Sequence, residues 1–122
     1  PGEGCEACAI REYREELGPL PRLAAGPLAL SPLEVPPSRF LVWPFVAVAA
    51  GAPDFEPNPD EVADVLEPSL AELLDPANAR EYEAAWDGKA WRIPYYQLCG
   101  RRVWGATAMI LSEFAVLLQG AG

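Results

Sequence analysis

The stretch PGEGCEACAIREYREELG, residues 1–18, decides how the first part of this chain folds. Its residue pattern predicts a helix over Cys5–Leu17, followed by Gly18 in the left-handed conformation that glycine adopts most readily. The last turn and a half of this helix would carry three carboxylates: Glu12, Glu15 and Glu16. They lie at the negative end of the helix dipole, where each added anion is unfavourable. Their spacings also place them on one face, where like charges repel.

Two interpretations of this acidic face follow from the spacing alone. A divalent cation bound by several carboxylate oxygens would offset both the unfavourable helix dipole and the repulsion between the carboxylates. Magnesium or manganese is the usual choice for such hard ligands. Alternatively, the face is solvated and its repulsion is eased by Arg11 and Arg14. The spacing leaves both interpretations open.

The same stretch resembles the signature box of the Nudix hydrolases, Gly-x5-Glu-x7-Arg-Glu-U-x-Glu-Glu-x-Gly-U, where U is a bulky apolar residue. From Glu3 to Gly18 every spacing of the box is matched. Pro19 stands where a bulky apolar residue is expected, and the first glycine of the box would precede Pro1. We therefore expect residues 1–122 to be a partial Nudix domain that begins inside the box and leaves some apolar surface uncovered.

The resemblance implies a role for each matching residue. It assigns metal binding to Glu12, Glu15 and Glu16, with Mg²⁺ or Mn²⁺ as the cofactor and Glu12 also a candidate for activating water. It makes Arg11 a structural ion-pair partner of Glu3, and Gly18 the end of the helix. A later loop often supplies a further carboxylate in this superfamily, and Glu61 is the best candidate for a second catalytic residue, although it could equally be a solvated loop acid.

Three later segments are similar to the coenzyme A pyrophosphatase branch of the superfamily: NPDEVADV at residues 58–65, PSL at 68–70 with LLDP at 73–76, and VWGATA at residues 103–108. They imply a hydrolase of the pyrophosphate linkage in coenzyme A or a related nucleoside diphosphate derivative. An ADP-ribose or nucleoside triphosphate pyrophosphatase is an alternative. A non-catalytic or incomplete Nudix module is another, although an intact glutamate trio argues against degeneration.

The remaining pattern predicts an α/β fold, a Nudix-type α/β/α sandwich with a mixed sheet. The expected strands are residues 39–50, a dense apolar run without a water-facing side, and 90–98 and 102–104. Residues 23–35 are expected to form an irregular strand or an edge hairpin, and residues 61–67 a short strand or, alternatively, a helical turn. The expected helices are residues 69–74, capped by Ser69, and 105–119. Aromatic residues of the strands are assigned to packing, although any of them could stack on an adenine: Trp43, Trp86, Trp91, Trp104, Tyr95 and Tyr96.

Composition restricts the function further. A net charge of −9 argues against nucleic-acid and anionic-membrane partners. The absence of histidine excludes hydrolase sites that use a histidine base, and it also weakens a zinc interpretation of Cys5 and Cys8. The odd number of cysteines, three, favours a reducing cytoplasm. The expected partner is a small nucleotide substrate, and a homodimer is left open.

Overall fold

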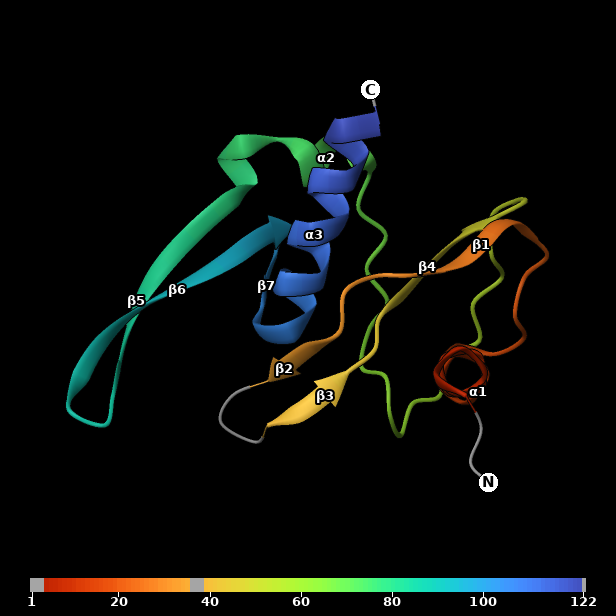
Figure 1. Ribbon diagram of the computed structural model, residues 1–122, viewed down its shortest axis with the longest axis horizontal. Coiled ribbons are helices and arrows are strands. Elements are labelled where there is room, and N and C mark those ends of the chain that lie inside the picture. The colour runs from red at the N-terminus through yellow and green to blue at the C-terminus, as the bar shows by residue number, and fades with distance from the viewer. Residues whose placement is uncertain (1–3, 36–38, 122) are drawn as a thin grey trace. The chain divides into compact units, whose positions relative to one another are not determined.

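The computed structural model describes residues 4–35 and 39–121 (Figure 1). The chain divides into two compact units, Pro1–Val65 and Leu66–Gly122. The first contains one helix and four strands, and the second contains three strands with the remaining helices.

Helix α1 spans Cys5–Leu17, as the sequence predicts. It follows Gly4, which supplies no side-chain cap. The helix ends at Gly18, whose φ is 93° and whose N–H donates to the carbonyl oxygen of Arg14 at 3.2 Å. A left-handed φ of this kind is strained for any residue with a Cβ, so glycine is the residue that fits the end of α1.

Four strands of the first unit form two antiparallel pairs. Strand β1 (Leu23–Ala29) pairs with β4 (Phe45–Ala49), and the register shifts twice along this pair. Strand β2 (Leu33–Val35) pairs with β3 (Phe40–Val42) in a regular register. Residues 23–35, expected to form an irregular strand or an edge hairpin, form two strands that pair with different partners and not with each other.

The single strand expected over residues 39–50 is wrong, because it is broken between β3 and β4 at Trp43 and Pro44. A proline has no N–H to donate, so it interrupts a ladder. The prediction that this run lacks a water-facing side is also wrong, since Phe40 is 73% exposed and Leu41 is 61% exposed. Residues 61–67 contain no strand either; Glu61 lies in a turn that begins at Asn58.

The second unit begins with α2 (Leu70–Leu74), a short helix capped as expected by Ser69, whose Oγ accepts from the N–H of Glu72 at 3.0 Å. A 3₁₀ turn, η1 (Pro76–Asn78), leads into a three-stranded antiparallel sheet. Its strands run in the order β5 (Ala79–Trp86), β6 (Lys89–Leu98) and β7 (Arg101–Trp104), and helix α3 (Gly105–Ala121) follows. The strand expected at 90–98, its return at 102–104 and the final helix are confirmed within one or two residues at each end.

Both hairpin turns of this sheet contain two consecutive residues of positive φ. Asp87 and Gly88 have φ of 53° and 71°, and Cys99 and Gly100 have φ of 51° and 72°. Such pairs are typical of two-residue hairpin loops, whose backbone twist matches that of the flanking strands. The turns therefore fix the register of all three strands.

The core of the second unit lies on one face of its sheet. Leu98 is 1% exposed and packs with Leu73 of α2 and Ala115 of α3. Further apolar side chains surround this centre: Leu74, Tyr96, Val103, Leu111 and Phe114. Helix α3 buries Ala108 and Ala115, whereas Met109 and Leu117 are about half exposed, at 49% and 48%.

The α/β class expected from the sequence is confirmed, since helices and sheets are both present. The strand pairs of the described residues are all antiparallel. The layering of an α/β/α sandwich with a mixed sheet stays a prediction. No helix within the described residues is long and apolar enough to cross a membrane.

Candidate functional site

Helix α1 carries the acidic residues singled out by the sequence, and Arg11 lies between two of them. Its Nη1 is 3.1 Å from Oε1 and 3.2 Å from Oε2 of Glu15, while its Nη2 is 3.5 Å from Oε1 of Glu12. All three side chains are about half exposed. Exposed pairs of this kind contribute at most about 1 kcal/mol each. Arg11 thus eases the repulsion that the sequence predicts, without making the cluster strongly stable.

A loop of the first unit is fixed across the C-terminal end of α1. The carbonyl oxygens of Glu16 and Leu17 accept from the N–H groups of Asn58 and Glu56, each at 2.8 Å. Carbonyls in the last turn of a helix have no partner within the helix, so these bonds satisfy two of them. The end of α1 that carries the glutamates is therefore held by tertiary hydrogen bonds.

Gly18 allows this loop to approach. A Cβ added at Gly18 would lie 2.8 Å from Cβ of Glu56 and 3.3 Å from its backbone nitrogen. Together with the positive φ, this contact explains why glycine stands here. The structural role expected for Gly18 has a direct physical basis in the packing of the loop.

Glu61 lies in the same loop segment, in an exposed turn rather than before a strand. Its N–H donates to the carbonyl oxygen of Asn58 at 3.0 Å, and Asn58 Oδ1 accepts from the N–H of Asp60 at 3.1 Å. Because Asn58 is also bonded to Glu16, the turn that carries Glu61 is tied to the acidic end of α1.

The opposite face of α1 packs against apolar side chains. Tyr13 and Ile10 line an apolar cavity of about 380 Å³ together with Leu23 of β1 and Phe45 of β4. Burial raises the pKa of the Tyr13 hydroxyl above its ordinary value of 10.0. Glu12 and Glu15 are exposed and are absent from the lining of this cavity, whereas Glu16 is half-buried.

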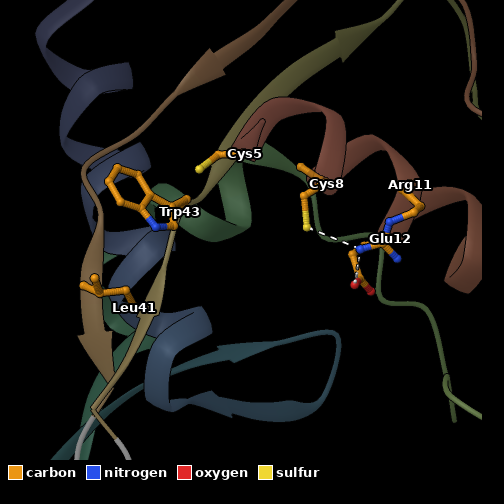
Figure 2. Close-up of a pocket in the computed structure, with 7 residues that line it drawn as sticks. Cys5, Cys8, Arg11, Glu12, Leu41 and Trp43 are labelled. Carbon is orange, nitrogen blue, oxygen red and sulfur yellow. Dashed lines mark hydrogen bonds and ion pairs between the residues drawn. The ribbon is translucent and has the colours of Figure 1, made fainter. Parts of the chain in front are cut away.

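An open depression of about 780 Å³ adjoins Glu12 and Arg11 (Figure 2). Its wall includes Cys8, whose Sγ is 3.6 Å from Nη2 of Arg11. The spacing of four between Cys8 and Glu12 indicates a shared helix face, and this was the signal that could have joined the cysteine to the carboxylates. Leu41 and Trp43 complete the wall from the segment around β3. Trp43 was one of the aromatic residues that could stack on an adenine, whereas no sequence signal pointed to Leu41.

The donor chemistry of Glu12, Glu15 and Glu16 fits a hard divalent cation, because Mg²⁺ and Mn²⁺ take carboxylate oxygens. Within residues 4–35 and 39–121, however, no group of three or more His, Cys, Asp or Glu side chains is already arranged around one point. Two of the carboxylates turn to Arg11 instead. A cation would have to compete with this guanidinium. Glu3, the expected partner of Arg11, lies outside the described residues.

The chain is similar to known proteins over most of its length. A protein of Photorhabdus laumondii named Uncharacterized Nudix hydrolase NudL is 30% identical over 114 residues, which cover 93% of this chain and 60% of that protein. The chain is similar to Nudix hydrolases. A Nudix protein of the same name from Pectobacterium atrosepticum is 35% identical over 115 residues, covering 91% of this chain and 57% of the relative. No family model matches the chain.

These similarities support the Nudix superfamily for this chain, in agreement with the motif at residues 3–18. The chain spans less than two thirds of the length of both Nudix relatives, 60% and 57%. The names of these relatives specify no substrate.

Proposed function

We propose that this chain carries the metal-binding helix of a Nudix hydrolase that cleaves the P–O–P linkage of coenzyme A or a related nucleoside diphosphate derivative. The observation that carries the proposal is the exposed acidic end of α1. Its glutamates are displayed on a helix end that Gly18 and the segment around Asn58 hold in place. The similarity to two proteins named Nudix hydrolase supports the same reaction class.

The roles of the residues follow from their chemistry. Glu12, Glu15 and Glu16 would hold Mg²⁺ or Mn²⁺, and Arg11 would release Glu12 and Glu15 when the ion binds. The bound ion supplies charge neutralisation at the phosphoryl oxygens and lowers the pKa of water. Glu12 would accept a proton from the attacking water, and Glu61 is the second candidate for this role because its turn is tied to the end of α1.

The substrate is the finer part of the proposal. Coenzyme A is favoured by the resemblance of residues 58–65 and 103–108 to one branch of the superfamily. ADP-ribose and nucleoside triphosphates are the alternative substrates, and a non-catalytic or incomplete module is the alternative function. A cytoplasmic location and a homodimer are also proposed. Assays with the three substrates on the protein as it occurs in the cell would separate these alternatives.

Metal binding is the first test, because it needs no substrate. Isothermal titration calorimetry of the chain with Mg²⁺ and Mn²⁺ should show binding that the double variant Glu15→Gln/Glu16→Gln weakens at least about tenfold, as expected when two charged ligands are lost. Glu6→Gln is the matched control, since Glu6 is an exposed acid in the first turn of the same helix. Unchanged affinity in the double variant would refute the metal site.

A further inference from the structure

The sheet of the second unit has two chemically different faces. Side chains alternate between faces along a strand, and Leu98, Tyr96 and Val103 point to the core formed with α2 and α3. The strand register places the residues that alternate with these on the other face. At its centre these are Arg80, Tyr82, Tyr95, Arg102 and Trp104, which we call the Trp104 face. The sheet and α3 can be followed in Figure 1.

The Trp104 face carries an exposed indole, that of Trp104, and two half-buried tyrosine rings, those of Tyr82 and Tyr95. Trp104 is 57% exposed and lies directly opposite Tyr95 in the β6–β7 register. The rings of Tyr82 and Tyr95 have centroids 5.7 Å apart. A large exposed indole beside a pair of fixed tyrosine rings is a stacking surface for a flat ligand.

The charge of this face is positive. The guanidinium carbon of Arg102 lies 4.2 Å from the ring centroid of Tyr82 and 4.9 Å from that of Tyr95. Arg80 lies directly opposite Tyr95, and its Nε donates to the carbonyl oxygen of Ala77. Within residues 4–35 and 39–121, neither Arg80 nor Arg102 forms an ion pair with a carboxylate. The remaining N–H groups of both side chains are available to an anion.

The acidic residues of the hairpin lie on the other face. Glu81 and Glu83 lie opposite Pro94 and Arg92 in the β5–β6 register, on the face that does not carry Trp104. Glu81 forms an ion pair with Arg92 at 3.2 Å. The two faces therefore separate charge, although the chain as a whole has a net charge of −9. A cationic face on such an acidic protein favours an anionic ligand over a second copy of the same chain.

We propose that the Trp104 face binds a free nucleotide, with the base stacked on the indole of Trp104 and the phosphates bonded by Arg102 and Arg80. An exposed indole near two guanidinium groups that form no ion pair within the described residues matches both halves of such a ligand, because the base has a π-face and the phosphates are anionic. The site consists of residues of β5, β6 and β7 only. It does not depend on the hydrolase activity or on the carboxylates of α1.

ADP in the presence of EDTA is the probe, and calorimetry is the measurement. The absence of a divalent ion excludes binding through the carboxylates of α1. Trp104→Ala should weaken ADP binding by about five- to a hundredfold, the range for the loss of one stacked base. Arg102→Gln should weaken it by at least about fivefold, as for a lost charge-assisted hydrogen bond. Adenosine keeps only the base and sugar, and inorganic pyrophosphate keeps only the phosphates. Each should therefore bind at least about tenfold more weakly than ADP.

Trp86 provides the matched control. It is 61% exposed and belongs to the same face, but it pairs with Trp91 near the hairpin tip, where the indole N–H of Trp91 donates to the carbonyl oxygen of Trp86 at 3.1 Å. Trp86 lies opposite Lys89, six residues from Tyr95 along β6, which is about 20 Å at a rise of about 3.4 Å per residue. Trp86→Ala should leave ADP affinity within about twofold of the unmodified chain, and so should Glu15→Gln/Glu16→Gln.

Several results would overturn the proposal. One is the absence of ADP binding to the unmodified chain. Another is an ADP affinity in both Arg102→Gln and Trp104→Ala that equals the affinity of the unmodified chain. If Trp104→Ala fails to fold, Trp104→Phe replaces it; this variant keeps an aromatic ring and should retain ADP affinity within about fivefold. Loss of ADP binding in Trp104→Phe together with unchanged binding in Arg102→Gln would refute the assignment. A single-stranded oligoadenylate that binds more than about tenfold tighter than ADP would make this a nucleic-acid surface instead.

Discussion

The backbone N–H of Asn58 donates to the carbonyl oxygen of Glu16 at 2.8 Å, and this bond joins two segments more than forty residues apart. Glu16 belongs to the acidic end of α1, and Asn58 begins the turn that carries Glu61. The bond satisfies a helix-terminal carbonyl and fixes the loop beside the proposed metal ligands. It therefore links the stability of the helix end to the position of the second candidate base.

The first prediction concerns the helix end. Gly18→Ala should lower the free energy of unfolding by about 2 kcal/mol or more, because a Cβ is disfavoured at positive φ and would meet Glu56 at 2.8 Å. Urea unfolding measures the change. Gly51→Ala is the control, since a Cβ there would have no atom within 4 Å. Equal losses in the two variants would mean that the loop does not pack on Gly18.

The second prediction concerns catalysis. In the protein as it occurs in the cell, Glu12→Gln should lower turnover of a pyrophosphate substrate at least about a hundredfold, as expected for loss of a general base or a metal ligand. Magnesium-dependent release of a phosphoadenosine product from coenzyme A is the measurement. Glu6→Gln, at the other end of the same helix, should keep normal turnover. If Glu12→Gln also kept it, the assignment of Glu12 would be refuted.

Glu61 is tested in the same assay as a separate prediction. Glu61→Gln should lower turnover if its turn delivers a carboxylate to the reacting water, and Asp60→Asn is the neighbouring control. Both residues are exposed and follow Asn58. A fully active Glu61 variant would return this residue to the role of a solvated loop acid.

The fourth prediction concerns Arg11, which competes with a cation for Glu12 and Glu15. Arg11→Gln should tighten Mg²⁺ binding by about two- to fivefold at low salt, because removing one positive charge at about 4 Å is worth up to roughly 1 kcal/mol in water. Arg14→Gln is the control on the same helix and should have a smaller effect. Weaker Mg²⁺ binding in Arg11→Gln would show that Arg11 supports the ligands rather than competing for them.

The fifth prediction follows from the raised pKa of Tyr13. Burial favours the neutral hydroxyl in the folded state, so this contribution to stability is present below the unfolded pKa of about 10 and is lost as pH rises through the folded pKa. Urea unfolding between about pH 8 and 11.5 should show a smaller loss of stability in Tyr13→Phe than in the unmodified chain. Tyr82→Phe serves as the control. The same pH dependence in Tyr13→Phe would refute the burial effect.

Local signals in the sequence were read correctly where the decisive partners lie close along the chain. Helix α1, its end at Gly18 and the cap at Ser69 all depend on residues within four positions of one another. The position of Arg11 beside Glu15 follows from the same helical spacing. The break before Pro44 was also predictable, because a proline cannot continue a central ladder, and the apolar run around it concealed this signal.

The sequence by itself determined the acidic helix, its glycine end and the resemblance to the Nudix box, since these are properties of spacing and of the local backbone. Only the tertiary structure decided that the segment at Glu56 and Asn58 closes over the end of α1. It also decided that Arg102 lies over Tyr82 and Tyr95 on one face of the sheet. Both arrangements join residues far apart in the chain, and their energies come from hydrogen bonds, packing and register that form only when the distant segments meet.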